Sequence, residues 1–416
     1  MDAAVQQKPQ IIFKDFTGLR NDRPPERFTT TDLVTATNVD IDNSGMPKRR
    51  LGQTLIDTVV RHSVWADVAQ TQMFAVETNT GYLVSFDNNF VSTTLRGMSS
   101  KTLRVSYSKV NDRVYYSTEQ DIGIIENGAN RSWGLPVPPL PGIVNIGAGS
   151  MPTGTYQFVL TYMRTDGQES GASLAGVVTV PDQSGITFSL PTPTDPQIAA
   201  MNLYISTPDG AIMYLAGTVA SNATQIAYLN NTLELNYPLQ TQFLSPPPAG
   251  QLVMYYRGHM FVAAGDTIYP SEPYAYELFD LRKGFSLDGK VTLLAPIEDK
   301  ERPGLSEGMD SGFFIGTTRS CGILVGKDPI GFQYVPKVNY GAITGTLVMV
   351  DGSLYGDDKA GARLLPMWLT TAGICVGMPQ MEVQNITRTR YGFTAKGIGA
   401  ALFIPGPNKL ILTCNY

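Results

Sequence analysis

The stretch LVMYYRGHMFVAAGDTIYP, residues 252–270, decides the fold class of this 416-residue chain. Its apolar runs are short, and Gly, Asn, Asp or Pro bounds such runs throughout the chain, which is typical of strands joined by turns. Related strand–turn–strand stretches occur at residues 64–86, 103–126, 291–325 and 342–376. The sequence therefore predicts an all-β protein.

These stretches recur at a spacing of about 40–50 residues, the length of a propeller blade. We therefore expect a β-propeller built from residues 1–141 and 248–416, with one large sandwich or two stacked sandwiches as the alternative. The chain ends in an apolar strand around Leu410–Leu412, which needs a pairing partner. The N-terminal hairpin at residues 36–51 is the expected partner, so N- and C-terminal strands together would close the ring of blades.

Proline runs at residues 136–141 and 246–248 border a stretch of sequence that lacks the repeat, as linkers at a domain edge do. Inside it, GTYQFVLTYMR (residues 154–164) alternates apolar and polar residues. About seven short strands in roughly 100 residues match the size of an immunoglobulin-like or fibronectin-like β-sandwich. Residues 142–247 are therefore predicted to be a sandwich inserted into the propeller.

The composition limits the function classes. With 31 basic and 36 acidic residues, the formal charge of −5 argues against nucleic-acid binding by bulk charge. No apolar run reaches the roughly 18 residues of a membrane span. The acidic N-terminus lacks an apolar stretch, so no secretory signal is expected. Helical windows are few, with single turns expected at residues 196–201 and 274–281.

Metal and redox chemistry find little support in the sequence. The three cysteines are far apart and are expected to be reduced, buried thiols: Cys321, Cys375 and Cys414. Two histidines, His62 and His259, are too few for a multi-histidine metal cluster. Residues 40–45 begin like a calcium loop, but Leu51 stands where the twelfth-position acid belongs, so a tight hairpin turn is expected.

Catalytic motifs are missing as well: the chain has no G-x-S-x-G, P-loop or H-E-x-x-H pattern. The acid pairs at residues 298–299 and 357–358 lie in polar stretches and are expected to be solvated. Propeller glycosidases do use carboxylates that line the axial channel, but the sequence does not show which acids converge. We therefore predict that the protein is not an enzyme and needs no cofactor or metal.

Basic residues gather in the first fifty positions, where acids are interleaved with them: Arg20, Arg23, Arg27, Lys48, Arg49 and Arg50. One interpretation is a solvated surface held by salt bridges. The functional interpretation is a docking arm for a neighbouring subunit or an adaptor. DNA binding by this region is the weaker version, because phosphate contacts need uncompensated positive charge.

Three segments of the chain resemble the tail hub or nozzle proteins of short-tailed bacteriophages, also called packaged-DNA stabilisation proteins. They are FKDFTGLRNDRPPERFTTTDLVTATNVDIDNSGMPKRRLG (residues 13–52), YYRGHMFVAAGDTIYPSEPYAYELFDLRKGF (255–285) and MWLTTAGICVG (367–377). The first is similar to the family's N-terminal segment with its hairpin and basic R-R-x-G. The others are similar to two of its strand pairs. Residues 142–247 do not align with the family.

The resemblance implies a structural protein of the virion tail, assembled in the bacterial host. Family members form a homo-oligomeric ring, commonly of six subunits, below the portal and its adaptor. The ring retains packaged DNA, forms its exit channel without sequence specificity, and carries tail fibres or spikes. An acidic lining would keep DNA mobile, although the sequence does not identify the residues that line the channel. The alternative is a polysaccharide-binding or polysaccharide-hydrolysing propeller of a phage tail.

Overall fold

The computed structural model describes residues 15–299 except 43, 53 and 68, and residues 312–415 except 327–330, 356–362, 405 and 407. The protein is all-β, as predicted, and the described residues include no α-helix. Within the described residues, four short 3-10 helices interrupt the strands: η1 (Pro25–Arg27), η2 (Thr232–Glu234), η3 (Leu281–Lys283) and η5 (Gly352–Tyr355).

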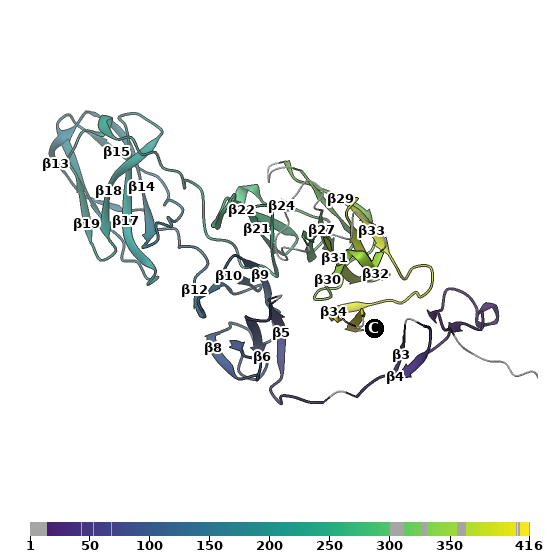
Figure 1. Ribbon diagram of the computed structural model, residues 1–416. Helices are drawn as coiled ribbons and strands as arrows, with labels where there is room; N and C mark the ends of the chain where they lie inside the picture. The colour runs from purple at the N-terminus through teal and green to yellow at the C-terminus, as the bar shows by residue number, and fades with distance from the viewer. Residues whose placement is uncertain are drawn as a thin grey trace, which may run out of the picture.

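Two four-stranded antiparallel sheets form the first part of the body, and in each the strands pair in chain order (Figure 1). The repeated stretches at residues 64–86 and 103–126 supply most of their strands. Sheet I contains β5 (Arg61–Ala66), β6 (Met73–Glu77), β7 (Tyr82–Phe86) and β8 (Ser92–Gly97). Sheet II contains β9 (Ser106–Val110), β10 (Arg113–Ser117), β11 (Ile122–Glu126) and β12 (Ala129–Arg131).

Three further sheets follow after the residues between β12 and β20. Sheet III contains β20 (Leu252–Tyr256), β21 (His259–Ala264), β22 (Thr267–Glu272), β23 (Ala275–Phe279) and β24 (Phe285–Ser286). Sheet IV contains β25 (Val291–Pro296), β27 (Phe313–Thr317), β28 (Cys321–Val325) and β29 (Gln333–Val338). Sheet V contains β26 (Glu298–Asp299), β30 (Val348–Asp351), β31 (Arg363–Thr370), β32 (Gly373–Met378) and β33 (Glu382–Asn385).

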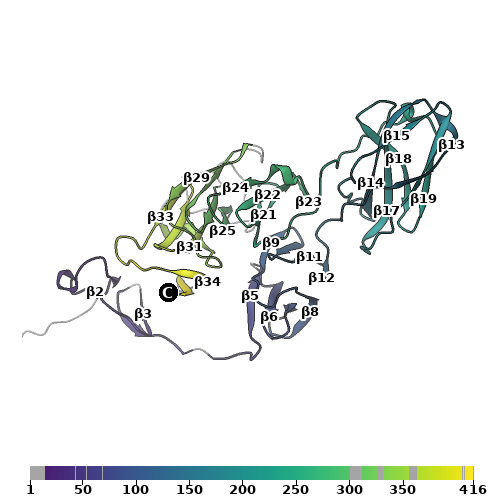
Figure 2. The ribbon, with the colours of Figure 1, turned by 180° about the vertical axis from the view of Figure 1, so that it is seen from behind.

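Each of these sheets shares an apolar core with the next sheet along the chain. Tyr116 of sheet II belongs to the cluster that contains Phe74 of sheet I. Aromatic pairs mark other boundaries: Phe261 with Phe313 between sheets III and IV, and Phe314 with Trp368 between sheets IV and V, at ring-centroid distances of 5.1 and 5.8 Å. Burial of large aromatic surfaces of this kind dominates core energetics. The five sheets therefore form one continuous series (Figure 2).

A two-sheet unit lies between sheets II and III in the sequence and stands to one side of the series (Figure 1). One sheet has the order β13-β16-β19, with β13 (Gly142–Met151), β16 (Ser184–Ser189) and β19 (Gln225–Tyr228). The other has the order β15-β14-β17-β18, with β15 (Gly176–Val180), β14 (Gly154–Arg164), β17 (Ile198–Ser206) and β18 (Met213–Ala220). Both sheets contribute to one core, in which Phe158 of β14 packs on Phe188 of β16.

The predicted strand at residues 154–164 is β14, and its four apolar side chains on one face are buried. The two expected helical turns are wrong. Residues 198–206 form β17, because pairing with β14 and β18 outweighs the helix preference of two alanines. Residues 275–279 form β23, and only the following η3 is helical.

The chain termini form two hairpins that remain separate sheets. The N-terminal one pairs β3 (Val39–Ile41) with β4 (Pro47–Arg49), around the predicted turn, of which Asn43 lies outside the described residues. The C-terminal one pairs β34 (Lys396–Ile404) with β35 (Lys409–Asn415). Two short strands, β1 (Gly18–Leu19) and β2 (Asp32–Leu33), pair in parallel ahead of β3.

We expected the N-terminal hairpin to extend the last sheet, but no backbone ladder joins the two hairpins within the described residues. They meet instead through side chains, because Lys409 Nζ of β35 lies 2.5 Å from Asp40 Oδ2 of β3. β34 and β35 pack on sheet V through Phe403 and Leu410, and among the described residues they form a separate two-stranded sheet.

The fragment of residues 142–247 is expected to fold alone, since one of its cores draws every buried member from that range. A cooperative thermal transition and a dispersed amide NMR spectrum are the expected results. A spectrum typical of a disordered chain would contradict the existence of a separate unit.

Candidate subunit interface

The six basic residues singled out in the sequence all lie in the N-terminal arm, residues 15–50, which precedes sheet I. The structure pairs four of them with nearby acids. The pairs are Arg20–Asp22 at 2.7 Å, Arg23–Asp22 at 3.4 Å, Lys48–Asp42 at 2.8 Å and Arg50–Asp40 at 3.1 Å. Arg27 and Arg49 are exposed and make no ion pair with any described residue.

Hydrogen bonds to the acids of the arm keep them charged. The backbone N–H and hydroxyl of Thr29, together with Arg20, lower the pKa of Asp32 to about 2 despite the opposing effect of desolvation. Hydrogen bonds from Lys48, the Ser44 hydroxyl and backbone N–H groups lower the pKa of Asp42 even further. With six basic and six acidic residues, the arm carries no net charge, although Arg27 and Arg49 make no ion pair with a described residue.

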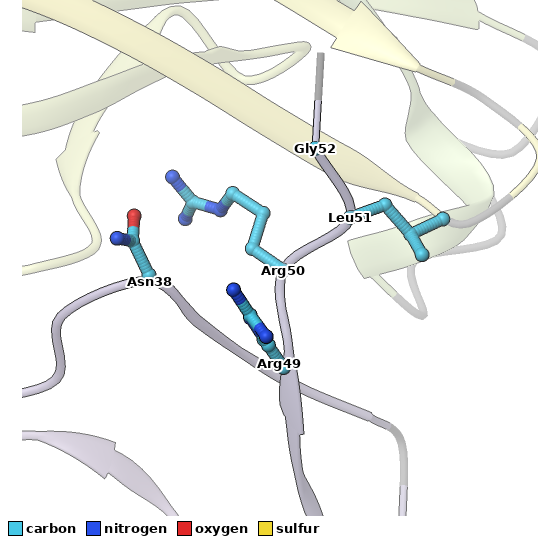
Figure 3. Close-up of a pocket in the computed structure, with 5 residues that line it drawn as sticks. All are labelled: Asn38, Arg49, Arg50, Leu51 and Gly52. Carbon is cyan, nitrogen blue, oxygen red and sulfur yellow. The ribbon is translucent and has the colours of Figure 1, made fainter.

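A recess of about 630 Å³ opens beside the N-terminal hairpin, lined by residues 49–52 and Asn38. Figure 3 shows the side chains of Asn38, Arg49 and Arg50 on one side of the chain, whereas the Leu51 side chain points away from them. Arg50 is held by Asp40, but the guanidinium of Arg49 has its donors available. A planar guanidinium beside an amide is well suited to bind a carboxylate of a neighbouring protein.

The arm is bound to the C-terminal part of its own chain. Asn21 donates to the carbonyl oxygen of Gly392 and accepts from its backbone N–H, both at 2.6 Å. Arg390 in turn donates to the carbonyl oxygen of Thr17 at 3.1 Å. These bonds join residues about 370 apart in the sequence. They hold the N-terminal arm next to the segment between β33 and β34.

A buried carboxylate joins the two-sheet unit to the series. Glu277 of β23 is 3% exposed and accepts from Arg131 of β12 and Arg164 of β14, each at 2.9 Å. The backbone N–H of Gly134 also donates to it at 3.2 Å. Asp166 holds the other side of Arg164 at 2.8 Å. Sequence analysis placed Glu277 in a helical turn and missed this role, because its partners lie 113 and 146 residues away.

Replacing Glu277 with Gln is expected to destabilise the protein by up to about 3–5 kcal/mol, because Arg131 and Arg164 would lose the buried carboxylate that they share and would keep the more exposed Glu126 and Asp166. Chemical denaturation measures this change. Glu272→Gln is the matched control, since its carboxylate pairs only with Lys283 and is more exposed. An equal and small effect of both substitutions would show that the network does not hold the junction.

The junction also predicts a pH dependence. Burial by itself raises the pKa of Glu277, but the hydrogen bonds from Arg164 and Arg131 lower it below the usual glutamate range. A lowered folded-state pKa gives stability that is complete above the unfolded pKa of about 4.3 and is lost as the pH falls through the folded value. Limited proteolysis of the segments that flank the two-sheet unit should therefore stay constant from pH 8 to 5 and increase only below pH 4. An increase already between pH 7 and 5 would contradict this assignment.

The first strands of successive sheets converge on a cavity of about 210 Å³. Residues of β5, β9, β20 and β25 line it, together with Thr344, Gly345 and Leu347 just before β30. Arg104 lies at its wall, makes no ion pair with a described residue and donates to the carbonyl oxygen of Gly399 on β34 at 2.7 Å. This bond ties sheet II to the C-terminal hairpin across 295 residues.

Of the two acid pairs that were expected to be solvated, the structure describes only the first. Glu298 and Asp299 form β26 beside β31 instead of a polar loop, because their backbones pair with residues 363–364. Asp357 and Asp358 lie outside the described residues. Two of the three thiols are buried as expected, Cys321 and Cys375, whereas Cys414 is only partly buried.

No protein-family model matches the sequence, and no curated protein matches it. Solved structures show remote similarity. The extracellular domain of a hybrid two-component system from B. thetaiotaomicron has 10% identity and a TM-score of 0.26, over 89% of this chain and 60% of that one. AztD from Citrobacter koseri has 10% identity and a TM-score of 0.27, over 84% and 88%. The V. cholerae biofilm matrix protein Bap1 has 11% identity and a TM-score of 0.22, over 84% and 58%.

The chain thus spans about 60% of the length of the first of these structures. TM-scores this low support no statement about function. Within the described residues, no helix has the length and apolarity needed to cross a membrane.

Proposed function

We propose that this protein is a β-propeller with an immunoglobulin-like or fibronectin-like sandwich inserted at residues 142–247, and that it forms the tail hub or nozzle ring of a short-tailed bacteriophage. In this proposal residues 1–141 and 248–416 make up the propeller. The ring retains packaged DNA below the portal and its adaptor and provides its exit channel.

One observation carries the propeller: the first strands of sheets I to IV, with the segment before β30, meet at a single cavity. In a propeller, blades surround an axis and their innermost strands face it. Blades also pack on their neighbours in chain order, as the shared cores of sheets I to V do. The two-stranded hairpin β34–β35 takes the place of a sixth, incomplete blade.

The inserted sandwich is supported by the two sheets of residues 142–247 and their common core. Seven antiparallel strands in two packed sheets are the pattern of an immunoglobulin-like domain. The unit is attached through Glu277 and can carry a contact to another tail protein, such as a fibre or spike, without disturbing the series of sheets.

The hub assignment is supported by the location of the resembling segments. Residues 13–52 include the N-terminal arm, residues 255–285 most of sheet III, and residues 367–377 most of the β31–β32 pair. They thus fall on the arm and the propeller. The arm offers a docking element the guanidinium groups of Arg27 and Arg49, which make no ion pair with a described residue.

In such a ring the residues of the protein serve to bind neighbouring subunits and not to catalyse a reaction. The net charge of −5 disfavours tight adhesion of DNA to the protein. The genome could therefore slide through the channel. Arg27 and Arg49, which make no ion pair with a described residue, suit acidic side chains of a neighbouring subunit or of the adaptor. No step of this role requires a cofactor.

The purified chain of residues 1–416 is expected to form closed rings of six copies, counted by mass photometry and seen by cryo-EM. Incubation with host-surface polysaccharide is expected to release no oligosaccharide. A monomer at all concentrations, together with polysaccharide cleavage, would favour the alternative of a polysaccharide-acting tail propeller.

A further inference from the structure

The cavity at which the first strands of the sheets converge is lined by one cation and many apolar side chains. Its volume of about 210 Å³ is below the roughly 300–1,000 Å³ of sites for drug-sized ligands, so it suits a small molecule. Among the described residues that line it, Arg104 is the one with a charged side chain, and most others are apolar, such as Leu252, Leu293 and Leu347. Val64 also lines the cavity and is 64% exposed, which places this wall at the molecular surface.

Arg104 has fewer partners than comparable arginines at other sheet boundaries. Its Nη1 group donates to the carbonyl oxygen of Gly399 at 2.7 Å, and neither Nε nor Nη2 donates to a described residue. Arg96 and Arg131, in contrast, each bind a carboxylate that is 3% exposed, at 2.9 Å. A guanidinium has five N–H donors in a planar fork. Arg104 therefore has donors left for a further acceptor.

The pKa of Arg104 is consistent with this lack of a counter-charge. Burial lowers the pKa of Arg104, and desolvation is the one cause of that shift. Desolvation also acts on Arg164, but its hydrogen bonds to Asp166 and Glu277 raise the pKa of that arginine above the usual value. Arginine nevertheless stays protonated in proteins. An anion bound beside Arg104 would therefore offset the cost of burying its charge.

Gly345 provides the space in which the guanidinium lies. Its φ is +86°, and a Cβ at this position would collide with the guanidinium carbon and both terminal nitrogens of Arg104. A glycine is therefore required here by conformation and by space. Because Gly345 itself lines the cavity, this contact places the guanidinium at the cavity wall.

A buried hydroxyl is a second polar group without a partner. Thr292 lines the cavity, is 7% exposed and lies where the register of β25 shifts between Val291 and Leu293. Its Oγ1 has no hydrogen-bond partner among the described residues. The hydroxyls of Ser63 and Ser106, which also line the cavity, accept from backbone N–H groups. A buried hydroxyl without a partner costs free energy that a bound acceptor would recover.

We infer that this cavity binds a small monocarboxylic acid with an apolar body. Its carboxylate accepts from the remaining donors of Arg104 and supplies the acceptor that the Thr292 hydroxyl lacks. One negative charge matches the single cation, whereas inorganic phosphate brings a second charge and leaves the apolar walls uncovered. The apolar body instead covers those walls. The inference does not depend on the ring of the proposed function, because all of these groups belong to one chain.

Benzoate is the probe for this site, because it carries one carboxylate on a small apolar ring. Isothermal titration calorimetry on the chain of residues 1–416 is expected to show saturable binding of one benzoate per chain. Benzamide has nearly the same shape without the charge and is expected to bind at least about tenfold more weakly. Inorganic phosphate at the same concentration is expected not to displace benzoate. Displacement by phosphate would indicate a general anion site and would overturn the carboxylate assignment.

Two substitutions locate the site, and the melting temperature of each variant is measured alongside. Arg104→Lys keeps the positive charge but removes the planar fork, so benzoate is expected to bind at least about tenfold more weakly. Thr292→Val removes the hydroxyl from a side chain of similar shape and is expected to weaken binding about threefold. Its melting temperature is expected to stay the same or rise, because a buried hydroxyl without a partner is lost.

The matched controls are Arg96→Lys and Thr241→Val. Arg96 is also partly buried, and Thr241 also has a buried hydroxyl without a partner among the described residues. Neither residue lines the cavity. Both controls are therefore expected to bind benzoate like the parent chain.

The outcomes separate this inference from the proposed function. A parent chain that binds no benzoate, or that binds benzamide equally well, overturns the inference and leaves the ring intact. Equal binding of benzoate by the parent chain and by the folded Arg104→Lys and Thr292→Val variants places the site elsewhere and also overturns it. A chain that stays monomeric but binds benzoate in the expected way overturns the ring and supports the inference.

Discussion

The structure depends on one constraint: each sheet of the series buries an apolar face against the sheet that follows it. A linear series that packs in this way has two end faces without a neighbour. At one end, Val64 and Tyr82 of sheet I are exposed on the side opposite Trp65 and Leu83. At the other end is the C-terminal hairpin β34–β35. A complete propeller would bring the two ends together, and Arg104 already bridges part of that distance by its bond to Gly399.

The inserted unit shows how such a series accommodates a long insertion. The chain leaves after β12 and returns at β20, yet sheets II and III still share a core that contains Trp133 and Phe279. The carboxylate of Glu277 lies where the chain leaves the series of sheets. It pairs with Arg131 of sheet II and with Arg164 of the two-sheet unit. A buried charge is costly unless all of its partners are present. The network therefore fixes the position of the unit in a way that apolar packing, which is non-directional, would not.

Much of the local structure could be predicted from the sequence because the strands of this protein coincide with short apolar runs bounded by turn residues. The run at residues 154–164 is β14, and the turn before Pro47 does close a hairpin. The predictions were wrong where residues far apart in the sequence determine the local structure. Ala199 and Ala200 lie in a strand because β14 and β18 flank them, and the two terminal hairpins meet through Lys409 and Asp40, 369 residues apart.

The N-terminal arm has an orientation that its own chain sets. It carries six basic and six acidic residues, and four of the basic residues pair with acids of the same arm. Bonds between Asn21 and Gly392 and between Arg390 and Thr17 hold it against the C-terminal part of the chain. In an interface, charge placement provides orientation. Because the arm is held in this way, an arriving subunit would meet a surface whose geometry is already set, which lowers the entropy that ordering would otherwise cost.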